Sequence, residues 1–172
     1  MHFFQRPAGH LLAGITLSGV LSAIYVQGDH AWVLGFVMLV PWLRTLDTRP
    51  SLPGALMSAW LMSVAFTAAA FWWFGLAIGD YTQVGGPIGL AVLLLLAPFF
   101  QPQFLAFSLA RHLAGQRQGP AVRALAGAAA WVGAEWALPK VLGDTLGYGL
   151  YPSAVMRQFA DIGGSAGLTV ML

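Results

Sequence analysis

Long apolar stretches separated by short polar segments run along the whole chain of 172 residues. A helix that crosses the hydrocarbon core of a bilayer needs about 20 mostly apolar residues. By this criterion the sequence predicts membrane spans near residues 8–26, 31–43, 52–79, 87–110 and 121–138, and a partial span at 161–172. We therefore expect one all-α domain over residues 1–172, a polytopic membrane helix bundle of five spans plus the start of a sixth.

Two of the predicted spans carry irregularities. The stretch 31–43 is short and contains Pro41 near its end, which favours a tilted helix, a re-entrant helix or a helix in a thin region of the membrane. The stretch 87–110 is interrupted by Gln101-Pro102-Gln103, where proline removes a backbone donor and kinks the helix. Two glutamines in lipid need hydrogen-bond partners. Either they line a polar cavity, or they belong to a local kink in which neighbouring groups satisfy them.

The last apolar stretch is too short to cross a bilayer. An irregular linker over residues 139–160 is predicted to precede it. As a helix, the 12 residues 161–172 extend about 18 Å, against a hydrocarbon core of about 30 Å. We therefore expect more chain to follow, so that residues 1–172 are a fragment or one part of a split protein.

Composition narrows the range of partners. Hydrophobic residues make up 58% of the chain and charged residues only 8%, whereas a soluble domain carries about 25% charged residues. The formal net charge of +2 is too small to favour nucleic-acid binding. The chain has no cysteine, which excludes a disulfide, a thiolate metal site and a cysteine nucleophile among these residues. The sequence points to no cofactor.

Positive charges predict the orientation of the chain in the membrane. Six of the eight Lys and Arg residues lie at or between alternate ends of the predicted spans, namely Arg6, Arg44, Arg49, Arg111, Arg117 and Arg123. Cytoplasmic loops of membrane proteins are enriched in such residues. The N-terminus is therefore predicted to be cytoplasmic, and the linker that carries Lys140 and Arg157 to lie on the outer side.

One carboxylate, Glu135, lies inside a predicted span. An ionisable residue at such a position is a candidate functional residue, because placing a charge in lipid is costly. Trp131, four residues earlier, shares a helix face with Glu135. The alternative is that Glu135 lies near the outer helix end and pairs with Lys140 or with a backbone donor.

Trp72 and Trp73 lie near the outer end of the third predicted span. Tryptophan at this depth usually belongs to an interfacial belt; the alternative is that the two rings form the rim of a lipid-binding groove. No serine–histidine–aspartate set, phosphate-binding loop or pair of catalytic carboxylates can be assembled from the sequence. The residues alone therefore predict no reaction.

The C-terminal quarter of the chain resembles the membrane part of the bacterial apolipoprotein N-acyltransferases. That family has a Trp-x-x-x-Glu helix, a glycine-containing outer loop with an aromatic residue, and a Gln-x-Ala-Asp-x-x-Gly-x-x-Gly entry to the next span. The corresponding residues here are Trp131 and Glu135, the loop from Gly143 to Tyr151, and Gln158, Ala160, Asp161, Gly164 and Gly167. Val40-Pro41-Trp42-Leu43, Phe71-Trp72-Trp73 and Gly85-Gly86-Pro87 extend the resemblance. Gly143-Asp144-Thr145-Leu146 departs from the Gly-Phe-Pro-Trp of many members.

The resemblance implies a multi-pass protein of the bacterial inner membrane. Its partners would be phospholipid, which donates an acyl chain, and diacylated lipoprotein, whose N-terminal amine receives it. The family carries out this transfer with a Glu-Lys-Cys triad in an outer nitrilase-like domain, and no such domain is present in this sequence. The resemblance implies that these spans anchor that domain and guide lipid, that Trp131 and Glu135 orient the outer loops, and that Trp72 and Trp73 line the lipid approach.

Two other functions compete with this interpretation. The chain is alternatively a non-enzymatic membrane protein that binds lipid or acts as a scaffold for a partner. A small transporter is the second competitor, favoured by the broken fourth span, although such a protein should carry more polar groups at mid-membrane depth or an inverted repeat.

Overall fold

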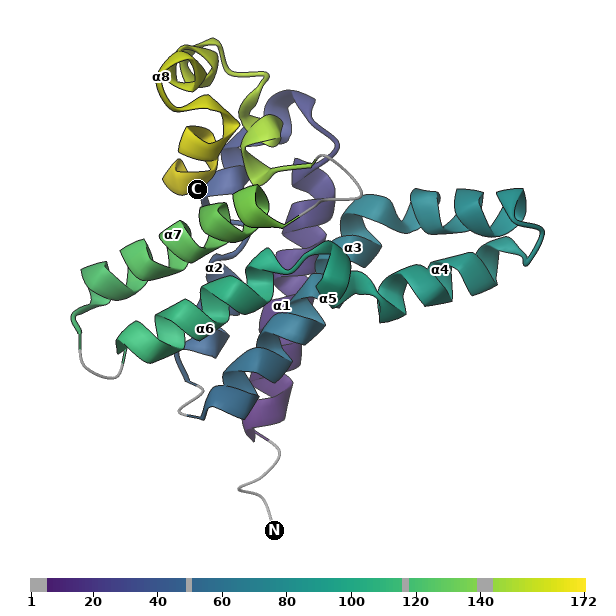
Figure 1. Ribbon diagram of the computed structural model, residues 1–172, viewed down its shortest axis with the longest axis horizontal. Coiled ribbons are helices and arrows are strands. Elements are labelled where there is room, and N and C mark those ends of the chain that lie inside the picture. Colours follow the sequence, from purple (N-terminus) through teal and green to yellow (C-terminus); the bar gives the residue numbers. More distant parts are fainter. Residues whose placement is uncertain (1–5, 49–50, 116–117, 139–143) are drawn as a thin grey trace.

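The computed structural model describes residues 6–48, 51–115, 118–138 and 144–172, and every regular element in these ranges is helical (Figure 1). The elements are α1 (Arg6–Tyr25), η1 (Asp29–Phe36, a 3-10 helix), α2 (Val40–Leu46), α3 (Leu52–Tyr81), α4 (Gly86–Leu95), α5 (Ala97–Phe100), α6 (Gln103–Gly115), α7 (Pro120–Ala137), η2 (Leu146–Leu150, also 3-10) and α8 (Ala154–Met171). The prediction of an all-α fold is confirmed.

The helix bounds depart from the predicted stretches at three places. Residues 31–43 are divided between η1 and α2, and residues 87–110 between α4, α5 and α6. The prediction of an irregular linker up to residue 160 is wrong from Ala154 onward, where α8 begins. Ser153 begins a helix there, because its side chain accepts a hydrogen bond from the Met156 backbone N–H, as an N-cap residue does. Arg49, Arg117, Lys140 and Gly143 lie outside the described residues.

One helix in the described part of the chain, α3, is long and apolar enough to cross a membrane by itself, at 30 residues. Shorter apolar helices occupy Gly9–Tyr25, His30–Leu46 and Gly86–Leu95. The five membrane crossings expected from the sequence therefore remain a prediction, because the lengths of the helices do not establish how many of them cross the membrane.

Aromatic rings fill the centre of the molecule where α2, α3, α6 and α7 meet. Phe104 of α6 lies at its middle, with ring-centroid distances of 4.7 Å to Trp131 and 5.5 Å to Trp42. Phe66 of α3 adds a third contact at 5.5 Å. All four side chains are buried. Such offset and edge-to-face pairs add about 0.5–1.5 kcal/mol each beyond area burial, so this cluster fixes how the four helices cross.

A hairpin of two helices extends away from this centre (Figure 1). We call residues 72–96, the C-terminal part of α3 with α4, the arm. Gly85 makes its turn with a φ of 95°, a conformation that glycine adopts readily. A Cβ atom added to Gly89 would lie 2.6 Å from the Gly79 Cα atom. The two helix backbones therefore touch, and only glycine fits where they do.

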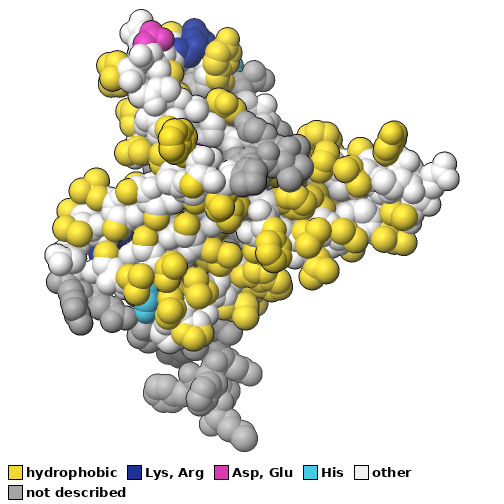
Figure 2. Space-filling model, in the orientation of Figure 1, with side chains coloured by type: hydrophobic (Ala, Val, Ile, Leu, Met, Phe, Trp, Pro, Cys, Tyr) yellow, Lys and Arg dark blue, Asp and Glu magenta, His cyan; other side chains and the backbone are white. Residues whose placement is uncertain are grey.

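Hydrophobic side chains cover the face of the molecule drawn in Figure 2, over the arm and over α6 and α7. Exposed apolar residues on the arm include Trp72, Trp73, Ile78, Ile88, Val92 and Leu95. Acidic and basic side chains are visible at the top of this face, over α8 (Figure 2). An apolar surface of this extent is typical of a protein that contacts lipid or a partner.

Candidate functional site

Glu135 and Trp131 lie on one face of α7, as the four-residue spacing predicts. The Trp131 indole Nε1–H donates a hydrogen bond to Glu135 Oε1 at 3.1 Å. The Trp131 ring is buried against Phe104, at 4% exposure, whereas Glu135 is half-buried. The tryptophan thus anchors one carboxylate oxygen to the aromatic centre, and the other oxygen points toward a different element.

That second oxygen binds the segment that leads into η2. The Thr145 hydroxyl donates to Glu135 Oε2 at 3.0 Å, and it lies 2.7 Å from the Thr169 hydroxyl of α8. Thr169 Oγ1 also accepts a hydrogen bond from the Gly147 backbone N–H at 3.1 Å. A continuous line of hydrogen bonds therefore runs from α7 through η2 to α8. The alternative pairing of Glu135 with Lys140 falls outside the described residues.

A second polar line enters the same segment from the break between α5 and α6. Gln101 and Gln103 are buried, at 1% and 2% exposure. The Gln103 side-chain amide donates to Gln101 Oε1, and the Gln101 amide donates to Asp144 Oδ2 at 3.1 Å. The predicted break at Gln101-Pro102-Gln103 is confirmed. The two glutamines bind each other and Asp144, as expected for a local kink whose polar groups are satisfied by neighbouring residues. Gln103 Oε1 has no hydrogen-bond partner in the described part of the chain.

The segment held by these two lines forms one wall of an apolar groove of about 430 Å³. Its lining includes Tyr25 at the end of α1, Phe66, Ala70 and Trp73 of α3, and Leu146 and Tyr148 of η2. Binding sites for small molecules typically measure about 300–1,000 Å³ and are lined by apolar and aromatic side chains with a few polar groups. The polar groups here include the side chains of Asp144 and Thr145.

The two predicted tryptophans differ in their relation to this groove. Trp73 lines it, with its ring half-exposed and its Nε1–H bound to the Ala70 carbonyl oxygen at 3.1 Å. Trp72 is equally exposed, but among the described residues it is not part of the groove lining. Trp131 does not line the groove either and reaches it only through Glu135 and Thr145. Of the four predicted residues, Trp73 thus lines the groove and Trp72 lies on the surface. Trp131 and Glu135 support the groove from outside it.

A second, smaller cavity of about 260 Å³ borders the same segment. Glu135, Trp136 and Ser165 contribute to its lining. Asp144, Thr145 and Tyr148 border both this cavity and the apolar groove. The segment from residue 144 to residue 148 therefore contributes to both a more polar and a more apolar space, and the Glu135 carboxylate supports it through Thr145.

Several residues of this site were not predicted from the sequence. Tyr25 closes the end of the groove: its hydroxyl donates a hydrogen bond to the Leu146 carbonyl oxygen across 121 residues. A Cβ atom added to Gly149 would overlap the Tyr25 ring, so the glycine makes room for the tyrosine. The sequence offered only a tyrosine at the end of an apolar stretch, a residue type whose hydroxyl usually finds a hydrogen-bond partner when buried, and it did not indicate which partner.

The lining of the groove is mostly apolar, with the polar side chains of Asp144 and Thr145 among it. No group of three or more side chains able to hold a metal ion occurs among the described residues. The chain also holds no cysteine.

Comparison with known proteins identifies the family. Comparison with curated proteins gives no match, and comparison with solved structures gives none either. Residues 18–172 match the family described as apolipoprotein N-acyltransferase N-terminal domain. This match includes every residue of the groove and of its supporting hydrogen bonds, and the resemblance noted in the sequence is confirmed. The chain belongs to the apolipoprotein N-acyltransferase N-terminal domain family.

Proposed function

We propose that this chain is the membrane region of an apolipoprotein N-acyltransferase and that the apolar groove receives an acyl chain. The observation that carries the proposal is the groove itself, about 430 Å³ in volume and bordered by Trp73 and Tyr148. Its walls are largely aliphatic and aromatic, as a hydrocarbon chain requires. The polar side chains of Asp144 and Thr145 in its lining suit the ester end of a lipid, which carries hydrogen-bonding groups.

Trp131 and Glu135 act in this proposal as positioning residues. Neither contacts the acyl chain. Their role is to hold the wall from residue 144 to residue 148, because Thr145 is bonded to Glu135 at 3.0 Å and Glu135 to Trp131 at 3.1 Å. A displacement of this wall would narrow or widen the groove and change how the acyl chain is presented.

The family consists of bacterial membrane proteins, which supports a membrane location. We propose that the chain crosses the inner membrane several times with its N-terminus in the cytoplasm. The arginines Arg111 and Arg123, predicted to share the cytoplasmic side, lie together on Asp47, which supports that orientation. Phospholipid and diacylated lipoprotein are then the lipids that reach the groove from the outer leaflet.

The test fills the groove in the enzyme that contains this chain. Ala70 lines the groove on α3, so Ala70→Trp should occupy the space of the acyl chain. Ala77→Trp is the matched control, because Ala77 is an exposed residue of the same helix and does not line the groove. Both variants are assayed in membranes for transfer of a fluorescent acyl chain from phospholipid to a diacylated lipoprotein.

We expect Ala70→Trp to slow acyl transfer at least tenfold, while Ala77→Trp retains most of the activity. Equal rates for the two variants would contradict the proposal. If Ala70→Trp abolished lipid binding but no acyl transfer could be detected even in the unmodified protein, the non-enzymatic lipid-binding role would replace the acyltransferase role.

A further inference from the structure

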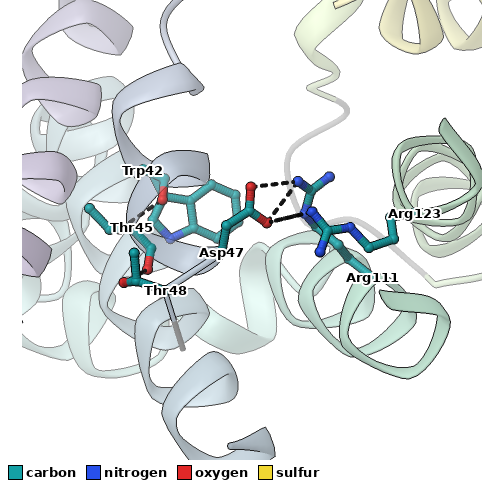
Figure 3. A network of polar contacts seen from close by, with 6 residues as sticks. All are labelled: Trp42, Thr45, Asp47, Thr48, Arg111 and Arg123. Atoms are coloured by element: carbon teal, nitrogen blue, oxygen red, sulfur yellow. Dashed lines mark hydrogen bonds and ion pairs between the residues drawn. The ribbon is translucent and has the colours of Figure 1, made fainter. Parts of the chain in front are cut away.

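A cluster of charged side chains ties α2 to α6 and α7 at the end of the bundle that carries Arg111 (Figure 3). Arg111 donates hydrogen bonds to Asp47 from two nitrogens. Nη2 lies 2.8 Å from Oδ1 and 3.0 Å from Oδ2, and Nε lies 3.2 Å from Oδ1. Arg123 reaches the same carboxylate through Nη2, at 3.4 Å from Oδ1. One carboxylate thus serves two guanidinium groups.

The charges of this cluster do not balance. Two guanidiniums and one carboxylate carry a net charge of +1, because arginine stays protonated in proteins. Arg111 satisfies Asp47 almost completely, and Arg123 makes a single, longer contact. The Arg123 Nε–H is buried and has no acceptor among the described residues. Arg123 uses one of its five N–H donors on Asp47 and its side chain is 29% exposed, so it has donors to spare for a second anion at the surface.

The surroundings of the cluster limit what that anion is. The side chains of Arg111, Arg123 and Asp47 are 14%, 29% and 39% exposed, so the cluster opens to the surface. Apolar residues on the same turns of α6 and α7 are strongly exposed: Leu113, Val122 and Leu125. A ligand that fits both features carries a negative charge next to hydrocarbon. Basic pockets between membrane helices on the cytoplasmic side bind lipid head groups in this way.

We propose that Arg123, held in place by the Asp47–Arg111 pair, binds the phosphate group of an anionic phospholipid in the cytoplasmic leaflet. This site lies on a different part of the molecule from the apolar groove and takes a lipid as a bound stabilising partner and not as a substrate. The proposal rests on the membrane placement given above, and it does not depend on acyl transfer.

Gly115 supports this geometry. A Cβ atom added to Gly115 would lie 2.6 Å from the Arg123 Cδ atom, so the glycine lets the arginine lie across the end of α6. The two helices thereby bring Arg111 and Arg123 to the same carboxylate oxygen (Figure 3), and the phosphate would complete the set of acceptors.

The first experiment measures lipid affinity by native mass spectrometry of the protein in detergent. Phosphatidylglycerol is titrated against wild type, Arg123→Gln and Arg157→Gln, with phosphatidylcholine as the zwitterionic comparison. Arg157→Gln is the matched control, because it removes the same charge from α8, far from the cluster. An arginine near the membrane surface contributes about 1 kcal/mol to binding anionic lipid. Arg123→Gln should therefore lower the affinity for phosphatidylglycerol about fivefold and leave the affinity for phosphatidylcholine unchanged.

Three results would overturn the proposal. Arg123→Gln and Arg157→Gln could lower the affinity for phosphatidylglycerol equally, which would indicate that net charge alone attracts the lipid. Arg123→Gln could leave the affinity unchanged. Inorganic phosphate at millimolar concentration could displace the lipid completely, which would make the site one for a free anion.

A second measurement keeps the test decisive if Arg123→Gln does not fold. The wild-type protein is reconstituted in phosphatidylcholine nanodiscs with or without phosphatidylglycerol, and hydrogen–deuterium exchange is compared. We expect phosphatidylglycerol to slow exchange in residues 44–48 and 118–124 and to leave residues 154–160 unchanged. Equal exchange in both lipid mixtures would contradict the site.

Discussion

Thr145 donates a hydrogen bond to Glu135 at 3.0 Å and thereby links the last turn of α7 to the wall of the apolar groove. The two residues are ten positions apart, and α7 ends between them, at Ala137. This contact explains why a carboxylate is present in an apolar helix: it accepts hydrogen bonds from two different elements, and no hydrophobic residue could do so.

The first prediction concerns the coupling of these two residues. Glu135→Ala removes both acceptor oxygens and leaves the Trp131 and Thr145 donors without them, which should lower the free energy of unfolding by about 1–3 kcal/mol. Thr145→Val, which removes only the hydroxyl, should cost less. Because the two residues share one hydrogen bond, the double variant should be less destabilised than the sum by about 0.5–1.5 kcal/mol. Denaturant titration in detergent measures all four proteins.

Glu135→Gln is the control for this cycle. The glutamine oxygen can still accept from the Trp131 indole, while its amide can donate to Thr145, whose hydroxyl oxygen accepts. We expect near-native stability and only a modest loss of acyl transfer. Strict additivity of Glu135→Ala and Thr145→Val would show that the hydrogen bond does not hold the wall.

The second prediction concerns the buried glutamines. Gln101→Leu removes the acceptor of the Gln103 amide and leaves that donor buried without a partner, which should cost about 1–3 kcal/mol. Changing both glutamines to leucine removes the stranded group, so the double variant should recover part of the lost stability. Thermal unfolding, followed by near-ultraviolet circular dichroism, ranks the stabilities of wild type, Gln101→Leu and the double variant. A double variant less stable than Gln101→Leu would indicate that Gln103 has an essential partner of its own.

The third prediction concerns the arm. Gly89→Leu places a side chain where the backbone of α4 touches Gly79, so the two helices should separate by about 1–3 Å, toward the 8–10 Å spacing of ordinary helix pairs. The chain has no cysteine, so spin labels at Ile78→Cys and Ile88→Cys report this distance cleanly by pulsed electron resonance. Val92→Leu, at an exposed position of the same helix, should leave it unchanged. No change with Gly89→Leu would show that the arm is looser than its close backbone contact suggests.

Hydrophobic patterning predicted the helices and the break at Gln101-Pro102-Gln103 because both leave a local signature in the sequence. The spacing of Trp131 and Glu135 likewise predicted their shared face. The helix that begins at Ala154 was missed because its first turn mixes Arg157 and Gln158 with apolar residues and its start depends on the cap at Ser153. A window of mean hydropathy does not register a cap.

The groove and the arginine cluster could not be predicted, because each depends on contacts between distant segments. Tyr25 meets Leu146 across 121 residues, and Arg123 meets Asp47 across 76. Sequence spacing carries no information on such pairs. The distinction between Trp73, which lines the groove, and Trp72, which does not, is of the same kind: adjacent helical residues point about 100° apart, and only the packing of α3 decides which one faces η2.

Photo-crosslinking tests most directly whether the groove binds an acyl chain. A phospholipid with a diazirine at the end of one acyl chain is added to membranes that contain the protein, and the labelled residues are identified by mass spectrometry. We expect label on Trp73, Leu146 and Tyr148, reduced at least tenfold by Ala70→Trp and unaffected by Ala77→Trp. Label spread evenly over the exposed residues of the arm, with none in the groove and no response to Ala70→Trp, would contradict acyl-chain binding there.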